Sequence, residues 1–301
     1  MKKIIVASMN YEMPKHKSFE DFKKVVQAQV AEAVKNKAEI LLYPEYGSIE
    51  LVSLMDHWTQ KNLHKQLDEI QKYRDDFFSV YQNAAKLHQV VIVAPSFPYK
   101  LENGEFRNRA YVFFPDGSSD YQEKTMMTRF ENEEWKITKG DGVLKVFEYR
   151  NFKFGINICY DVEFADFALK LCQNGAEMIF VPSCTETHKG MNRVHIGARA
   201  RALENQCYVI VSQTINKVDY SEAIDFNTGK VAFYSTCDIG FPDDGILLES
   251  EINKPGWNYY QLDFELIQSV RKSGNVFNFA DQDVLSKREL RTVRQLSLGP
   301  A

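Results

Sequence analysis

Short apolar runs alternate with stretches whose apolar residues recur at helical spacing along most of the 301-residue chain. Residues 3–9 form an apolar run typical of a buried strand. Residues 18–38 open with Ser18, a residue favoured at helix N-caps, and Phe22 and Val26 follow at helical spacing, which predicts a helix. The same patterns predict further strands at residues 39–45, 90–97, 109–114, 146–149, 152–159, 177–183, 207–214 and 255–264, and further helices at 69–89, 162–176, 192–206 and 265–273. This alternation indicates a layered α/β fold.

Two pairs of neighbouring strands follow each other without a helix between them. One pair is 90–97 and 109–114, and the other is joined around Arg150 and Asn151, two residues that suit a hairpin turn. Because such connections join antiparallel strands, we expect mixed rather than purely parallel sheets.

The domain organisation follows from the extent of this pattern. It continues to about residue 275 without a linker rich in Gly, Ser or Pro, so we expect one domain over residues 1–275. Residues 276–301 are polar and lose the periodicity. We expect them to form a C-terminal tail that acts as an interface arm on a partner subunit.

The composition narrows the class of protein. Hydrophobic residues make up 44% and charged residues 26% of the chain, and the net charge is −4, so no basic surface for nucleic acid or anionic lipid is expected. No apolar run approaches the roughly 18–20 residues of a membrane-spanning helix. The N-terminal apolar run is short and no small-residue cleavage site follows it, so we expect a first strand and a cytoplasmic location.

The number and spacing of the cysteines exclude two kinds of site. There are five, and no two of them form a C-x-x-C pair, so neither a zinc knuckle nor a dithiol redox motif is indicated. A reducing compartment is the expected setting. We expect neither a metal nor an organic cofactor.

Three polar residues stand just after apolar strands: Glu45, Lys124 and Cys159. Chemistry in α/β folds gathers at strand ends, and these three groups could work together. The carboxylate would accept the thiol proton, the thiolate would attack a carbon, and the ammonium would stabilise the charge that develops. Taken singly, each has a structural alternative: Cys159 as a buried apolar residue, Glu45 as a turn residue and Lys124 as a surface residue.

The segments around these residues resemble the signatures of the nitrilase (carbon–nitrogen hydrolase) superfamily, and they occur in its order. "LLYPEYG" resembles the glutamate motif, "YQEKTMMTRFENEEW" the lysine motif, and "GINICYDVEFADF" the start of the cysteine motif. "HIGARARALENQCYVIVSQT" and "PDDGILLESEINKPG" resemble later segments of the family. The resemblance covers about residues 1–270.

This resemblance implies a four-layer α-β-β-α sandwich with two mixed sheets, and a Glu–Lys–Cys triad without a cofactor. It implies that Glu45 is the general base, that Lys124 helps to hold the oxyanion, and that Cys159 forms a thioester. The backbone N–H of Tyr160 would complete the oxyanion hole. Family members usually form homodimers or higher homo-oligomers, so the same is expected here.

The resemblance also implies a second glutamate close to the nucleophile. Glu131 best matches its usual offset from the lysine, Glu133 is the second choice, and Glu134 is a third candidate. The Tyr–Asp pair after the cysteine is similar to that of amidase-type branches, whereas nitrilases proper tend to carry Trp–Glu. Asp161 itself is expected to cap the helix that follows, with a direct chemical role as the alternative.

Other residues are candidates for the substrate pocket. Cys184 follows a strand end, His188 lies in the same region, and Glu133 is the third candidate. A Cys–His dyad that uses His188 or His195 is the rival mechanism. The basic segment "KGMNRVH", expected to be a loop, would suit an amide that carries a remote carboxylate.

These observations predict an amidohydrolase that acts on a non-peptide C–N bond of a small linear amide and releases ammonia or an amine. Hydrolysis of an N-carbamoyl amine or a nitrile is the enzymatic alternative. A catalytically silent scaffold protein is the non-enzymatic one. The expected partners are a small-molecule amide and further copies of the chain, with neither nucleic acid nor membrane.

Overall fold

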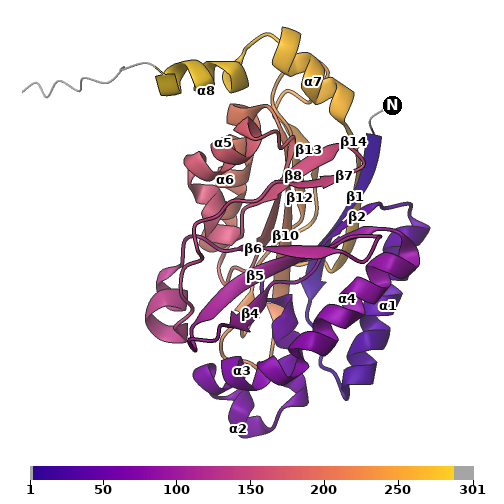
Figure 1. Ribbon diagram of the computed structural model, residues 1–301, viewed down its shortest axis with the longest axis vertical. Coiled ribbons are helices and arrows are strands. Elements are labelled where there is room, and N and C mark those ends of the chain that lie inside the picture. Colours follow the sequence, from indigo (N-terminus) through magenta and orange to yellow (C-terminus); the bar gives the residue numbers. More distant parts are fainter. Residues whose placement is uncertain (1–2, 288–301) are drawn as a thin grey trace, which may run out of the picture.

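The structure is a computed structural model that describes residues 3–287 and has a mixed α/β fold (Figure 1). Its strands are β1 (Lys3–Glu12), β2 (Ile40–Leu42), β3 (Val91–Val93), β4 (Phe97–Lys100), β5 (Phe106–Phe113), β6 (Ser119–Glu123), β7 (Phe147–Tyr149), β8 (Phe152–Ile156), β9 (Met178–Ser183), β10 (Tyr208–Lys217), β11 (Phe226–Asn227), β12 (Ala232–Tyr234), β13 (Ile246–Glu249) and β14 (Gly256–Asp263). Parallel and antiparallel pairs both occur, which confirms the expected mixture.

The strands pair in the order β4-β5-β3-β2-β1-β10-β9-β8-β7, and the remaining strands attach to β1, β5, β10 and β12. This order has two branches, β4-β5-β3-β2-β1 and β10-β9-β8-β7. They meet where β1 and β10 run parallel, with Asn10 opposite Gln213 and Glu12 opposite Ile215. Over the rest of its length β1 pairs with β2 on one side and β14 on the other. The strands that pair with β1 therefore change along its length.

The helices cover the strands on two sides. They are α1 (Phe19–Lys35), α2 (His57–Gln60), α3 (Leu63–Glu69), α4 (Arg74–His88), α5 (Ala165–Gln173), α6 (His188–Asn205), α7 (Phe264–Ser273) and α8 (Asn278–Lys287). Helices α1 and α4 lie side by side on one side of the strands, and α5 and α6 lie on the other (Figure 1). The Ser18 side chain caps α1 by accepting from the Asp21 N–H, and Phe22, Val26 and Val30 are buried, as the sequence predicts.

The structure confirms one predicted hairpin and changes the bounds of two predicted elements. The hairpin at Arg150 and Asn151 is confirmed: β7 and β8 pair antiparallel, and both turn residues have positive φ. The expected strand 90–97 is instead divided into β3 and the start of β4. The expected helix 69–89 begins with the 3-10 turn η2 (Ile70–Tyr73) before α4, and the short helices α2 and α3 are not predicted from the sequence.

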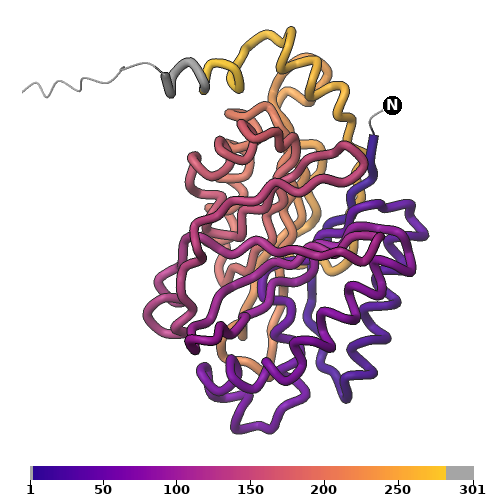
Figure 2. The backbone as a smooth tube through the Cα atoms, in the orientation of Figure 1, coloured from indigo at the N-terminus to yellow at the C-terminus, as the bar shows by residue number. Residues whose placement is uncertain are grey.

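The described part of the C-terminal tail is ordered against the domain. Helix α8 falls within residues 276–301, and the Phe279 N–H donates to Gln206 Oε1 at 3.2 Å. The Arg271 guanidinium lies 4.1 Å from the centre of the Phe279 ring. The start of β1 and helix α7 lie at the same end of the molecule (Figure 2). Residues 288–301 lie outside the described residues, and the interface arm stays a prediction.

The described part of the chain, residues 3–287, contains no helix long and apolar enough to cross a membrane.

Four strand ends supply the polar residues of one region. Glu45 follows β2, Lys124 follows β6, Cys159 follows β8, and Cys184 follows β9. Strands β8, β9 and β10 are mutually parallel, as are β1, β2 and β3. Their carboxyl ends therefore open toward the same place, where a rigid scaffold can hold side chains that are distant in sequence.

Candidate active site

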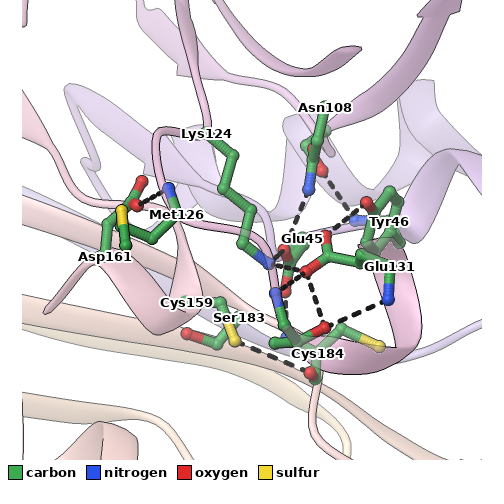
Figure 3. A network of polar contacts seen from close by, with 12 residues as sticks. Glu45, Tyr46, Asn108, Lys124, Met126, Glu131, Cys159, Asp161, Ser183 and Cys184 are labelled. Atoms are coloured by element: carbon green, nitrogen blue, oxygen red, sulfur yellow. Dashed lines mark hydrogen bonds and ion pairs between the residues drawn. The ribbon is translucent and has the colours of Figure 1, made fainter. Parts of the chain in front are cut away.

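The Glu45 carboxylate is buried, with 1% of the residue exposed, and three groups hold it in place (Figure 3). Its Oε1 accepts from Lys124 Nζ at 2.7 Å and from Asn108 Nδ2 at 2.9 Å. Its Oε2 accepts from the backbone N–H of Cys184 at 2.9 Å. Burial raises the pKa of Glu45 above its ordinary value, although Lys124 opposes the rise. A carboxylate with a raised pKa is a better proton acceptor than one in water.

Lys124 lies between two carboxylates. Its Nζ is 2.7 Å from Glu45 Oε1 and 2.6 Å from Glu131 Oε2, and the side chain is 1% exposed (Figure 3). Burial disfavours the ammonium, but the charges of Glu131 and Glu45 outweigh it and raise the pKa of Lys124 well above its ordinary value. Lys124 therefore stays positively charged at neutral pH.

Among the three candidate second glutamates, only Glu131 contacts Lys124. It lies in the π-helical turn η3 (Phe130–Trp135), where its Oε2 also accepts from the Thr128 N–H at 2.9 Å and its Oε1 accepts from the Tyr46 hydroxyl at 2.6 Å. Burial opposes its ionisation, but Lys124 and these donors hold the pKa of Glu131 below its ordinary value. Glu133 is exposed and pairs with Arg129, and Glu134 is exposed as well.

Cys159 begins the 3-10 turn η4 (Cys159–Glu163) with φ of 50°, in the left-handed region that non-glycine residues seldom adopt. Its Sγ lies 3.7 Å from the carbonyl oxygen of Cys184, to which the thiol donates. Burial raises the pKa of the Cys159 thiol well above its ordinary value, and the Glu45 carboxylate adds to the rise. The resting group is therefore a thiol, and it needs a base before it can attack.

Asp161 does not cap helix α5, contrary to the expectation. That helix has Phe164 at its N-cap position, with no side-chain cap. The Asp161 carboxylate instead accepts from the backbone N–H groups of Met126 at 2.7 Å and Thr125 at 3.1 Å (Figure 3). These two residues directly follow Lys124. Asp161 therefore ties the turn that carries Cys159 to the loop that carries Lys124.

The Asp161→Asn variant is expected to gain stability relative to the wild type as the pH rises from about 4 to about 7, by roughly 2–4 kcal/mol in total. Burial raises the pKa of Asp161 to about 7 from its ordinary 3.8. The folded state thus holds this proton more tightly than the unfolded state, and the wild type loses stability over that interval. Asparagine keeps an oxygen for the Met126 N–H but cannot ionise. Urea unfolding at several pH values measures the difference, and a difference that does not vary with pH would contradict this assignment.

A cavity of about 350 Å³ opens onto these side chains. Its lining includes Glu45, Lys124, Glu131, Cys159, Tyr160 and Cys184. Glu133 and His188 are not among its lining residues, and His188 is exposed. The structure thus brings Glu45, Lys124 and Cys159 together. The residues Glu131, Tyr160 and Cys184 line the same cavity.

The two histidines of the rival mechanism lie elsewhere. His195 is buried, and both of its ring nitrogens are engaged, with Nδ1 2.8 Å from the Tyr234 hydroxyl and Nε2 2.9 Å from Gln213 Oε1. Burial lowers the pKa of His195 to about 4. Neither His188 nor His195 lines the cavity that Cys159 shares with the Glu45 carboxylate.

Two residues of the site are not predicted from the sequence. Asn108 lies within β5 and holds Glu45 Oε1, and Tyr46 holds Glu131. Tyr46 has φ of 55°, which turns the chain immediately after Glu45, and its N–H donates to Ser96 Oγ at 2.8 Å. Its place next to Glu45 was the one signal that could have identified it. Nothing in the sequence near Asn108 marks it as part of the site.

Within the described residues, no cluster of three or more His, Cys, Asp or Glu side chains is arranged to hold a metal ion.

A model of a known protein family, the carbon-nitrogen hydrolases, matches residues 5–272. The chain belongs to this family. The resemblance of its motifs to the nitrilase superfamily is thereby confirmed.

Curated carbon–nitrogen hydrolase relatives show where the similarity extends. The chain is 31% identical over 277 residues to a probable hydrolase, YhcX, of Bacillus subtilis, which covers 92% of this chain and 53% of that protein. It is 30% identical over 141 residues to a deaminated glutathione amidase of Synechocystis, which covers 43% of this chain and 52% of that protein. The matches thus span about half the length of these relatives.

Solved structures of carbon–nitrogen hydrolases have a similar fold. A carbon-nitrogen hydrolase from Helicobacter pylori superposes with a TM-score of 0.75 at 17% identity, and the match covers 96% of each chain. At this level of identity the comparison establishes the fold alone.

Proposed function

We propose that this chain is an amidohydrolase that cleaves a non-peptide C–N bond of a small linear amide through a thioester on Cys159. One observation carries the proposal: a buried thiol shares a cavity with Lys124, which lies between the carboxylates of Glu45 and Glu131. This arrangement supplies a nucleophile, a base and a fixed cation. Membership of the carbon–nitrogen hydrolase family supports the same reaction class.

In the first half of the reaction, Glu45 takes the thiol proton as Cys159 Sγ bonds to the amide carbon. The carbonyl electron pair moves onto oxygen, where Lys124 Nζ and the Tyr160 N–H stabilise the negative charge. One such donor is worth about 3–4 kcal/mol of the barrier. The C–N bond then breaks, and ammonia or an amine leaves with the proton that Glu45 returns.

In the second half, water attacks the thioester while Glu45 takes a proton from it. The C–S bond breaks, Glu45 returns the proton to the Cys159 sulfur, and the acid product leaves. Because Lys124 neutralises part of the charge of Glu45 and Glu131, the base can cycle between its two protonation states without leaving an unpaired buried charge.

We also infer that the two strand branches pack face to face as a four-layer α-β-β-α sandwich. One hydrophobic cluster supports this, because it combines residues of one branch, such as Val6 and Val93, with residues of the other, such as Phe180 and Ile210. This arrangement would fix the strand ends that carry the site. The cytoplasmic location, the homodimer and the division at residue 275 remain predictions from the sequence.

Three substrates that share one side chain test the proposal: a primary amide, the corresponding nitrile and the corresponding N-carbamoyl amine. Ammonia release is measured for each with the wild type and with Cys159→Ala as control. We expect the amide to be the best substrate and the variant to release none above background. A nitrile or carbamoyl preference would select that alternative, and no release from any of the three would favour the scaffold protein.

A further inference from the structure

The ionisable residues on the outer wall of the cavity are mostly acidic. The wall comprises the lining residues that carry charge and are not fully buried: Glu163, Glu186, Arg193, Glu222 and Asp225. They come from η4, from the start of α6 and its preceding loop, and from the loop before β11. Together with the buried Glu45, Lys124 and Glu131, six carboxylates and two cations line the described cavity.

Both cations already have carboxylate partners. Lys124 is held by Glu45 and Glu131, and Arg193 Nε lies 3.4 Å from Glu163 Oε1. Among the described lining residues, no cation is therefore left unpaired to receive a substrate carboxylate.

The basic segment that suggested a carboxylate-bearing substrate does not change this balance. It is not a loop, because residues 189–195 lie within α6. Of its basic residues, only Arg193 lines the cavity. The amino end of α6 meets the wall, but the Thr187 side chain accepts from the Gly190 N–H at 3.2 Å and so occupies one of its donors.

Two wall carboxylates have no cationic partner among the side chains of residues 3–282. Among these residues, the Asp225 side chain accepts only from the Phe226 N–H, at 2.9 Å, and the Glu186 side chain has neither an ion pair nor a hydrogen bond. Glu222, by comparison, lies 3.6 Å from Lys61 Nζ. Glu186 and Asp225 are thus the wall charges available to a bound molecule.

We propose that this cavity selects amides that carry a positive charge remote from the reacting carbonyl, and that Glu186 and Asp225 determine this selectivity. The inference rests on the proposed function, because it names the substrate class of the same site. Opposite charges within a partly desolvated cleft attract, and a carboxylate-bearing substrate would meet repulsion there without a free cation.

The test compares three primary amides of equal chain length that end in an ammonium, a methyl group or a carboxylate. Ammonia release gives kcat/KM for each. We expect the wild type to prefer the ammonium amide to the carboxylate amide, and we expect this preference to weaken as salt screens the charges. Equal rates for these two amides, or a preference for the carboxylate, would overturn the inference while leaving the proposed function standing.

Matched variants assign the selectivity to residues. In the double variant Glu186→Gln/Asp225→Asn, we expect the ratio of kcat/KM for the ammonium and carboxylate amides to fall by about tenfold, since the two charges that are removed together supply an attraction of about this size in a partly screened cleft. Asparagine keeps the acceptor for the Phe226 N–H. Asp219→Asn is the control, because Asp219 is exposed and outside the cavity lining. An unchanged ratio in the double variant would refute the role of both residues.

A binding measurement keeps the inference testable if turnover fails. Calorimetric titration of Cys159→Ala with the ammonium and carboxylate amides compares their affinities without chemistry. Tighter binding of the ammonium amide supports the selectivity, and tighter or equal binding of the carboxylate amide refutes it. Absence of ammonia release from all three amides by the wild type would refute the proposed function alone.

Discussion

Replacing Lys124 by methionine is expected to abolish amide hydrolysis and to lower the free energy of unfolding by about 3–5 kcal/mol at neutral pH. Methionine keeps much of the side-chain volume but leaves Glu45 and Glu131 buried together without the cation between them. One of the two carboxyl groups must then hold a proton. A protonated Glu45 cannot accept the thiol proton, so stability and activity fail for the same reason.

The pH dependence of this loss separates it from a packing defect. In the wild type, protonation of Glu131 at low pH removes its attraction to Lys124, while in the variant a lower pH reduces the cost of protonating one of the two buried carboxyl groups. Both effects narrow the gap in unfolding free energy as the pH falls. Urea unfolding at several pH values measures this gap. A loss of less than about 1 kcal/mol at neutral pH would contradict the account.

Lys145→Met is the matched control for this experiment. Lys145 pairs with Asp120 at 2.6 Å, but both side chains reach solvent. Exposed ion pairs contribute about 0–1 kcal/mol, so we expect little change in stability. A control as damaging as Lys124→Met would show that the loss reflects general lysine replacement rather than the buried site.

Cys159→Ala is expected to reduce kcat for amide hydrolysis by at least about 10⁴-fold, because it removes the thiol that forms the thioester in the proposed reaction. Cys184→Ala is expected to cost less than about tenfold. Cys184 contributes its backbone N–H to Glu45 and its carbonyl oxygen to Cys159, and both survive the substitution. Alanine removes the thiol that lies 3.2 Å from Asn227 Oδ1, and this hydrogen bond does not reach Glu45, Lys124 or Cys159.

Ammonia release from the best amide of the panel compares the two variants directly. The melting temperature of each shows whether the fold is kept. If Cys184→Ala were the inactive variant and Cys159→Ala kept its activity, the nucleophile would be the wrong cysteine. Equal and large decreases in kcat in two well-folded variants would mean that the Cys184 thiol also takes part in the reaction.

The sequence predicts much of this arrangement because the site is built at strand ends. Glu45, Lys124 and Cys159 each follow an apolar run, and parallel strands bring their carboxyl ends together whatever the intervening loops do. The three motifs in the order of the family, together with two later segments, then distinguish this set from three unrelated polar residues. The hairpin is predicted on other grounds, since Arg150 and Asn151 suit a turn between two apolar runs, and in the structure both residues have positive φ.

Other features depend on geometry that no local pattern encodes. The rotation of the π-helical turn η3 decides which glutamate faces the site: Glu131 points inward, while Glu133 pairs with Arg129 outside. Because three of the four residues 131–134 are glutamates, the sequence does not show which of them faces inward. Asn108 could not be predicted because it acts across strands, 63 residues away from Glu45. Asp161 precedes a helix and so suggests a cap, but its true partners are backbone groups after Lys124.

The charge of the cavity wall could not be predicted from the sequence either. Residues 189–195 are basic in sequence, but of these basic side chains only Arg193 lines the cavity, where Glu163 pairs with it. Glu186 and Asp225 lie 39 residues apart in the sequence and line the same cavity only in the folded chain. A charge balance of this kind is a property of the cavity rather than of any segment.

The central claim is a thioester on Cys159, and peptide mass analysis after acid quenching tests it most directly. The wild type is mixed with the best amide, quenched within one turnover and digested. We predict that the peptide containing Cys159 gains the mass of the acyl group, that hydroxylamine removes it, and that the Cys159→Ala protein shows no such gain. An acyl group on another residue, or ammonia release at full rate without any acylated peptide, would contradict the account.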